Sequence, residues 1–158
     1  VLAINQGISE LETLVDQYII SHNTKKIDLK ALELYGSQKI VIPLSRFSKD
    51  ELEGIDVSRI VNFPMHVVDE ELSVSNECAK VPFDLTAAYA IAISIVLGFS
   101  SIYLAGFDGY NAGDIRQKEM SELFSLVKVN YPAVEIIALT PTTYPVAQSS
   151  VYAPVSHL

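Results

Sequence analysis

The sequence has only one cysteine, Cys78, among its 158 residues. An internal disulfide is therefore excluded, and so is a zinc site built from several thiolates. Cys78 itself is expected to be an ordinary loop or core thiol. This cysteine usage is typical of proteins in a reducing compartment, so we expect a cytoplasmic location.

Basic residues are also scarce, with 11 Lys and Arg against 19 Asp and Glu, which gives a formal charge of -8. Nucleic acid is not an expected partner, because neutralising phosphates needs a surplus of positive charge. The basic residues come in small groups, such as Arg46 with Lys49 and Arg116 with Lys118. These groups are either ordinary surface ion pairs or local anion sites on an acidic protein.

No apolar stretch is long enough to span a bilayer, which takes about 20 residues, and no signal-peptide pattern opens the chain. We therefore expect a soluble globular protein without a membrane span. The chain begins at Val1, directly in an apolar run and without a methionine. This beginning suggests a piece of a larger polypeptide.

Short apolar runs alternate with helical stretches, which is the pattern of a βα-repeating parallel sheet. The expected strands cover residues 1–4, 18–21, 39–42, 59–63, 101–105 and 135–139. We predict an α/β fold, a Rossmann-like, mostly parallel sheet of about six strands with helices on both faces. It would form a single domain over residues 1–146, followed by a coil-like C-terminal tail at 147–158.

Helical spacing and capping signals mark the expected helices. They cover residues 8–15, 29–34, 48–53, 87–97 and 114–130. Asp84 is the expected N-cap of the fourth helix and Gly98 its C-terminal stop. Ser48 and Glu51 have the spacing of a capping box. Residues 68–81 are expected to be a long irregular loop.

Polar side chains follow most of the expected strands. The candidate ligand-binding residues are Asn5, Asn23, Ser45, Asp108, Tyr110, Thr140 and Thr142. In a parallel sheet the carboxyl ends of the strands meet at one edge, where ligands bind. Asn, Ser, Thr and Asp beside helix N-termini suit a nucleotide or phosphorylated sugar, because amide dipoles stabilise anions. The alternative is that these residues only cap helices and turns.

The usual catalytic motifs are missing, including glycine-rich phosphate loops, metal-spaced His and Cys, and the nucleophile elbow. The catalytic candidates are therefore single residues, His22 and Asp108. His22 and His66 are both expected to be structural more often than catalytic, since neither has an evident carboxylate partner. The acidic run 69–71 could hold a divalent cation, but a solvated loop is the favoured interpretation, and no metal site is predicted.

Several motifs resemble the nucleotide-binding half of the family-42 bacterial sialyltransferases. These are Leu97-Gly98-Phe99, Ile102-Tyr-Leu-Ala-Gly-Phe-Asp-Gly-Tyr110, Asn5-Gln6, which looks like the family's cytidine-contacting pair, and Thr140-Pro141 after the last strand. The resemblance implies a glycosyltransferase that uses a CMP-activated sugar. The family's Gly-Asn-Gly-Pro-Ser phosphate loop is absent from this sequence, and the segment after Tyr110 is too short for its lid with a catalytic histidine.

A second and closer resemblance is consistent with both of these differences from the sialyltransferases. The sequence Ala-Ile-Asn-Gln at 3–6, Ile-Pro-Leu at 42–44, and the motifs at 103–110 and 139–144 resemble the C-terminal domain of hydroxymethylglutaryl-CoA-lyase-like aldolases from bacterial surface-polysaccharide pathways. Those proteins join a metal-dependent TIM barrel to a sialyltransferase-like α/β domain. The resemblance implies that the divalent metal belongs to the parent barrel, and that this chain has no cofactor of its own.

Three functions follow from these observations. The first is a domain that binds a nucleotide, nucleotide-sugar or sugar acid, has little or no catalysis alone, and has its own N-terminal catalytic domain as partner. The second is a CMP-sugar-dependent glycosyltransferase with His22 or Asp108 as base. The third is a structural or oligomerising module without a ligand, and assembly into a homo-oligomer stays open.

Overall fold

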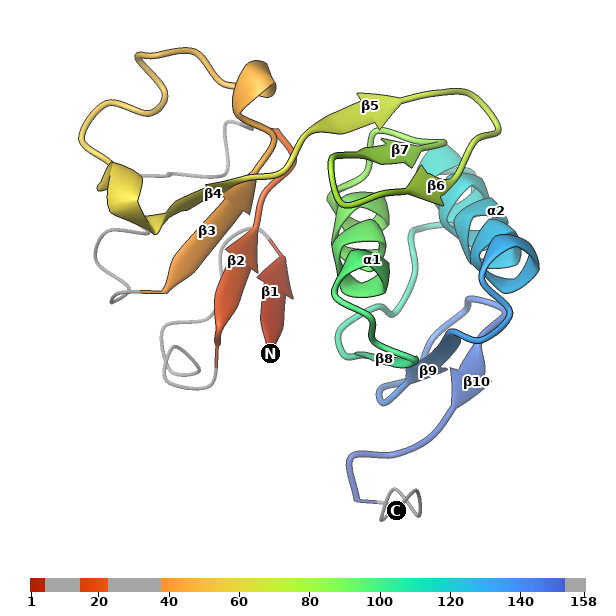
Figure 1. Cartoon of the computed structure of the whole chain (residues 1–158). Coiled ribbons are helices and arrows are strands. Elements are labelled where there is room, and N and C mark those ends of the chain that lie inside the picture. Colours follow the sequence, from red (N-terminus) through yellow and green to blue (C-terminus); the bar gives the residue numbers. More distant parts are fainter. Residues whose placement is uncertain (5–14, 23–37, 153–158) are drawn as a thin grey trace. The chain divides into compact units, whose positions relative to one another are not determined.

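The computed structural model describes residues 1–4, 15–22 and 38–152 (Figure 1). The chain divides into two compact units, residues 1–93 and residues 94–158, which are described separately below. The described elements are strands in three mostly parallel sheets, two α-helices and short 3-10 turns. The predicted α/β class is confirmed.

Unit 1 contains a four-stranded parallel sheet in the order β1-β2-β3-β4 (Figure 1). Its strands are β1 (Leu2–Ile4), β2 (Gln17–Ile19), β3 (Lys39–Ile42) and β4 (Ile60–Asn62). In the register of the sheet Tyr18 lies between Ala3 and Ile40, and both Tyr18 and Ile40 are only 1% exposed. The apolar runs of the sequence therefore form strands because they supply this core.

The capping box is present, but the helix expected at 48–53 is not. The Ser48 amide donates to the Glu51 carboxylate at 2.7 Å, and the Glu51 amide donates back to the Ser48 hydroxyl at 3.3 Å. Residues 49–54 nevertheless form turns, such as the bond from the Leu52 amide to the Lys49 carbonyl at 3.2 Å. Gly54, with a φ of +85°, ends the segment before a full helix can propagate. The 3-10 turns η3 (Leu44–Arg46) and η4 (Val57–Arg59) lie on either side.

The prediction of a long irregular loop at 68–81 is wrong, because this region contributes to a small sheet. Its strands, in the order β5-β7-β6, are β5 (Met65–Val67), β6 (Ser73–Val74) and β7 (Ala79–Val81). β5 runs parallel to β7, and β6 runs antiparallel to it. Ala79 and Val81 are completely buried, so alternate side chains of β7 supply a core that the polar surroundings hide in the sequence.

Helix α1 (Thr86–Val96) is apolar and buried on most of its sides, as predicted, and the boundary between the units falls after Ile93 within it. Gly98, with a φ of +80°, ends the helix in a Schellman motif. In this motif the Gly98 amide donates to Ile95 at 2.9 Å and the Phe99 amide donates to Ser94 at 3.2 Å. Asp84 lies two residues before the helix and pairs with Arg46, so its prediction as the N-cap is wrong.

Unit 2 contains a three-stranded parallel sheet in the order β10-β9-β8 and one long helix. Its elements are β8 (Ser101–Leu104), α2 (Ile115–Asn130), β9 (Glu135–Ala138) and β10 (Ala147–Gln148). Asp114 caps α2 by accepting from the Arg116 amide at 3.0 Å, and α2 buries the side chains of Met120, Leu123, Phe124 and Val127. Ile115, the first residue of α2, is 63% exposed.

The strands expected in one six-stranded sheet are divided between two sheets, β1 to β4 and β8 to β10. Residues 147 and 148 form β10 and not coil, while the single domain over 1–146 stays a prediction. The helices expected at 8–15 and 29–34 lie outside the described residues, except for Val15. None of the described helices combines the length and apolarity needed to cross a bilayer.

Candidate functional site

The carboxyl ends of β2 and β3 hold two of the predicted site residues in unit 1. His22 follows β2 and is partly exposed, and Ser45 lies in η3 after β3 and is exposed. Asn5 and Asn23 lie outside the described residues. The parallel sheet therefore places His22 and Ser45 at the same edge, as predicted for residues that follow neighbouring parallel strands.

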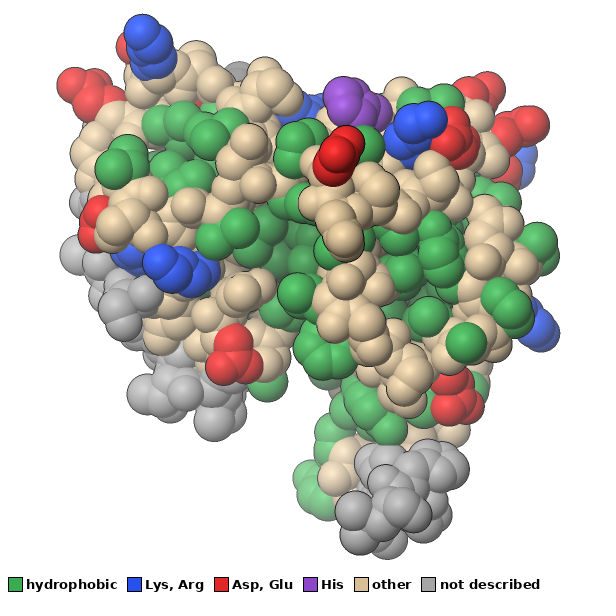
Figure 2. Space-filling view, in the orientation of Figure 1, with side chains coloured by type: hydrophobic (Ala, Val, Ile, Leu, Met, Phe, Trp, Pro, Cys, Tyr) green, Lys and Arg blue, Asp and Glu red, His purple; other side chains and the backbone are tan. Residues whose placement is uncertain are grey.

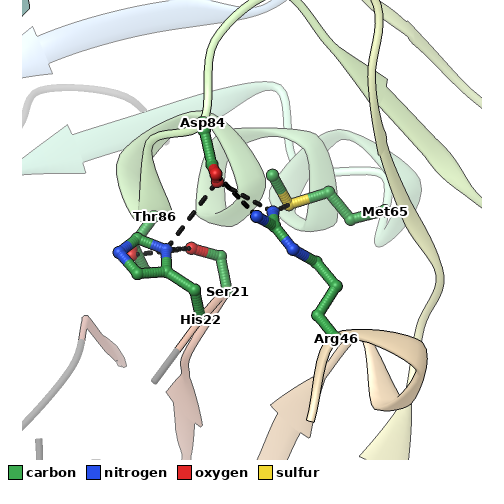
Figure 3. A network of polar contacts seen from close by, with 6 residues as sticks. All are labelled: Ser21, His22, Arg46, Met65, Asp84 and Thr86. Atoms are coloured by element: carbon green, nitrogen blue, oxygen red, sulfur yellow. Dashed lines mark hydrogen bonds and ion pairs between the residues drawn. The ribbon is translucent and has the colours of Figure 1, made fainter. Parts of the chain in front are cut away.

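An ion pair between Arg46 and Asp84 dominates this edge (Figure 3). Both terminal nitrogens of the guanidinium donate to the carboxylate, at 2.8 and 2.6 Å. The Arg46 guanidinium holds the pKa of Asp84 below its ordinary range, and the Asp84 carboxylate raises the pKa of Arg46. Each charge is satisfied by the other, because a two-point contact of this kind is the strongest form of carboxylate pairing.

Ser21, His22 and Asp84 come together in the same network, but they do not form a nucleophile triad (Figure 3). The Ser21 hydroxyl lies 2.8 Å from Nδ1 of His22 and 2.9 Å from the Thr86 hydroxyl, and the same Nδ1 lies 3.8 Å from Asp84. A triad needs the serine and the carboxylate on opposite ring nitrogens. Ser21 is also 0% exposed, so its hydroxyl cannot reach a substrate.

His66 and the acidic run lie elsewhere in unit 1. His66 is an exposed residue of β5. Glu71 accepts from the Ser73 hydroxyl at 2.7 Å and pairs with Lys80 at 3.1 Å, and these contacts lower its pKa. Over the described ranges, no group of three or more His, Cys, Asp or Glu side chains is placed to hold a metal ion.

In unit 2 the structure brings together four predicted site residues that follow β8 and β9. These residues are Asp108, Tyr110, Thr140 and Thr142. The Thr142 hydroxyl donates to the Phe107 carbonyl at 2.6 Å, and the Gly106 amide donates to the Thr140 hydroxyl at 3.0 Å. Both threonines therefore hold the loop after β8 in place.

Gln117 and Thr143 complete the bracing of this loop. Thr143 belongs to the threonine cluster after the last predicted strand, whereas the sequence patterns did not single out Gln117. Gln117 accepts from the Tyr110 amide at 2.8 Å and donates to the Thr143 hydroxyl at 3.0 Å. The Thr143 amide donates to the Asp108 carbonyl at 3.1 Å. Gly109 has a φ of +116°, and a Cβ there would lie 2.1 Å from the Thr143 hydroxyl oxygen. Only glycine fits this position.

The braced loop forms one wall of a pocket of about 210 Å³. The lining residues are Gly106, Phe107, Asp108, Gly109, Tyr110, Met120 and Tyr144. Tyr144 is 5% exposed and packs on Phe124 at 5.3 Å between ring centroids, and burial raises the pKa of its hydroxyl. The Asp108 side chain is exposed, and within the described ranges its carboxylate has no hydrogen bond or ion pair. We call this feature the unit-2 pocket.

The cation next to the unit-2 pocket is Arg116, whose guanidinium lies 4.3 Å from the centroid of the Tyr110 ring. The same guanidinium donates to both carboxylate oxygens of Asp114, at 3.0 and 2.6 Å. This contact raises the pKa of Arg116 and lowers that of Asp114.

On the face shown in Figure 2, the coloured Lys and Arg side chains are scattered among Asp and Glu and form no continuous basic patch.

Comparison with known proteins gives no match to a family model, to a curated protein or to a solved structure. The likeness to family-42 sialyltransferases and to the aldolase-appended domain therefore rests on the sequence motifs alone and stays a prediction.

Proposed function

We propose that this chain is a small-molecule-binding domain whose ligand is a nucleotide, a nucleotide-sugar or a sugar acid, and that it has little or no catalytic activity alone. The observation that supports this function best is the Asp108 carboxylate in the wall of the unit-2 pocket, which has no hydrogen bond or ion pair to any described residue. The backbone of Asp108 and of its neighbours Phe107 and Tyr110 is held by hydrogen bonds to Thr143, Thr142 and Gln117. A fixed loop that presents one free polar group is the arrangement expected of a preformed ligand site.

The chemistry of the lining favours a ligand that carries hydroxyl groups. An ionised carboxylate accepts hydrogen bonds and donates none, so Asp108 pairs best with hydroxyls or amines. Phe107, Tyr110 and Tyr144 provide the aromatic surface against which a ring can pack. A sugar ring offers both features, since it has hydroxyl groups around its edge and C–H groups on its faces.

The motif likeness supports placing this domain beside the barrel of a bacterial aldolase in surface-polysaccharide metabolism. The same proposal includes a Rossmann-like fold for this domain. The parallel β1-β2-β3-β4 sheet and the β8, α2, β9 crossover support it, because such parallel units are the building blocks of that fold. In this proposal the N-terminal barrel holds the divalent metal and performs the aldol chemistry.

Calorimetric titration of the intact protein with nucleotides, nucleotide-sugars and sugar acids tests the proposed function. At least one of these ligands should bind, and its affinity should fall about tenfold or more in Asp108→Ala, the loss expected for a hydrogen bond to a charged group. Asp69→Ala is the matched control, because Asp69 is an exposed aspartate of unit 1 with the same charge. Equal losses of affinity in the two variants would show that the ligand does not bind at Asp108.

A CMP-sugar-dependent glycosyltransferase is the second candidate function. The observation that favours it is the position of Asp84, 3.8 Å from Nδ1 of His22, which supplies the carboxylate partner that was not evident in the sequence. This function requires turnover of a CMP-sugar that disappears in His22→Ala or Asp108→Ala. Undiminished turnover in His22→Ala would remove His22 as its base.

The third candidate is a structural or oligomerising module without a ligand. The free Asp108 carboxylate argues against it, since a module of that kind has no use for a braced loop around an unpaired charge. Binding of any of the ligands above, weakened in Asp108→Ala, would exclude it.

A further inference from the structure

The unit-2 pocket contains one full charge, and that charge is negative. Asp108 is an acidic lining residue, and none of the seven lining residues is Lys, Arg or His. A phosphate or carboxylate inside the pocket would therefore face the Asp108 carboxylate without a compensating cation in the lining. At about 4 Å such like charges repel each other even in bulk water, and more strongly beside a protein.

Arg116 does not reverse this balance. It contacts Tyr110 from outside the lining, but two of its nitrogens are already bonded to Asp114. Asp114 and Arg116 together carry no net charge, so the negative charge of Asp108 remains uncompensated by them. An anion would have to compete with Asp114 for the guanidinium, and a surface anion gains little from a cation that is already paired.

Two backbone amides of the loop already have acceptors within the protein. Phosphate sites in proteins are built from free amides that converge on the anion. Here the Gly106 amide donates to Thr140 and the Tyr110 amide donates to Gln117. These two amides bracket the loop and are used to hold it in shape.

The size of the pocket sets a second limit on its occupant. Sites that enclose a complete drug-sized ligand have volumes of about 300–1,000 Å³. The unit-2 pocket has about 210 Å³, which is room for a single ring and not for a whole nucleotide-sugar. Aromatic side chains and one carboxylate are suited to a ring that is uncharged and bears hydroxyl groups.

We propose that the unit-2 pocket holds the uncharged, hydroxyl-bearing ring of the ligand, and that phosphate and carboxylate groups of the ligand lie outside the pocket. This inference rests on the proposed function and narrows it to the part of the ligand that is recognised. Asp108 accepts hydrogen bonds from ring hydroxyls, and it excludes an anionic substituent from the same space.

Chemical-shift titration by NMR of the full chain tests this charge selectivity. The probes are neutral hexoses, N-acetylhexosamines and the phosphate esters of the same sugars. At least one neutral sugar should shift the amide signals of Gly106 to Tyr110, and its phosphate ester should bind at least about fivefold more weakly. In Asp108→Lys the preference should reverse, because the lining charge changes sign. Asp69→Lys, with the same change in net charge outside unit 2, should keep the original preference.

The outcomes separate this inference from the proposed function. A phosphate ester that binds the unchanged chain more tightly than its neutral parent, at the same amide signals, would overturn the charge selectivity and leave ligand binding intact. A reversal that also occurs in Asp69→Lys would overturn the role of Asp108, because the net charge would then explain it. If no sugar, nucleotide or nucleotide-sugar binds, the proposed function falls and this inference falls with it.

Discussion

Two aspartates that each follow a strand have opposite surroundings. Asp84 lies after β7 in unit 1, where Arg46 donates to both of its carboxylate oxygens. Asp108 lies after β8 in unit 2, and in the described part of the chain no group donates to its carboxylate. The hydroxyl groups around the two aspartates are occupied in both places, by Ser21 with Thr86 in one and by Thr142 with Phe107 in the other.

This difference shows how a structural polar cluster can be told from a binding site. In unit 1 the strongest acceptor is satisfied by a protein cation, so the network stabilises the fold. In unit 2 the loop is stabilised by hydroxyl, amide and carbonyl groups, and the strongest acceptor is left over. A polar residue at the end of a strand is therefore a better candidate for binding a ligand when the neighbouring polar groups form their hydrogen bonds with other partners.

The largest effect on stability is expected for Gly109→Ala, which disrupts the braced loop of unit 2. The new Cβ would lie 2.1 Å from the Thr143 hydroxyl oxygen, at a φ of +116° that side chains rarely adopt. We expect a loss of about 2–4 kcal/mol in the free energy of unfolding, together with loss of the pocket. Denaturant titration measures the first and NMR shifts of residues 106–110 measure the second.

Gly113→Ala is the matched control for that variant. Gly113 also has a positive φ, of +91°, but no atom lies within 4 Å of its Cβ position. The Gly113→Ala variant should lose only the free energy that a side chain costs at a positive φ, about 1 kcal/mol. Equal losses in the two variants would show that the contact with Thr143 does not shape the loop.

Ser21→Ala should have the next largest effect, because it leaves two groups of the unit-1 network without their partner. The hydroxyl of Thr86 and Nδ1 of His22 both bond to the Ser21 hydroxyl, which is completely buried. We expect a loss of about 1–3 kcal/mol in the free energy of unfolding. In the double variant with Thr86→Val the total loss should be smaller than the sum of the single losses, since fewer groups are orphaned. Simple additivity in this double-mutant cycle would contradict the network.

Asp84→Asn should destabilise the protein by about 1 kcal/mol at neutral pH, because the pair with Arg46 is partly exposed. The Arg46 guanidinium keeps the pKa of Asp84 below its ordinary value of 3.8. The stabilisation is therefore present above that value and is lost as the pH falls toward the lower pKa of the folded state. Unfolding measured between neutral and strongly acid pH should show a smaller loss of stability in Asp84→Asn than in the unchanged chain or in Asp50→Asn.

Asp108→Asn should have the smallest effect on stability, within about 0.5 kcal/mol, as expected for an exposed side chain that bonds to none of the described residues. Its effect should appear only in ligand binding. The contrast with Asp84→Asn sharpens the comparison, because the two variants make the same chemical change. A loss of stability in Asp108→Asn as large as in Asp84→Asn would mean that Asp108 has a structural partner.

Most described elements were predictable where the sequence carries strong local signals. β3 and α2 match their predicted bounds closely, because a compact apolar run and the Asp114 cap mark them. Gly98 ends α1 as expected. The strands β6 and β10 were missed because two residues are too few to show an alternating pattern. The division of the strands among three sheets depends on pairing between distant segments, which local patterns do not encode.

The candidate site was predictable in part for the same reason. Asp108 and Thr142 follow buried strands, and parallel pairing of β8 with β9 brings them together. Gln117 and Tyr144 were missed, because a glutamine on a helix and an aromatic residue in a loop have no distinctive spacing. The pairing of Arg46 with Asp84 joins residues 38 positions apart, and nothing near either residue in the sequence signals it.

β10 has a consequence for the entropy of the chain. Its two residues pair with Ile137 and Ala138, and the Ser149 amide donates to Ala138 at 2.8 Å. The segment between β9 and β10, which contains Tyr144, is thus a closed loop held at both ends. Closing a loop of this length costs only a modest entropy, but a chain cut after Val146 would turn the loop into a free end. Tyr144 would then be held only by contacts such as its packing on Phe124, and the lost β10 anchor would add to the ordering entropy that opposes ligand binding.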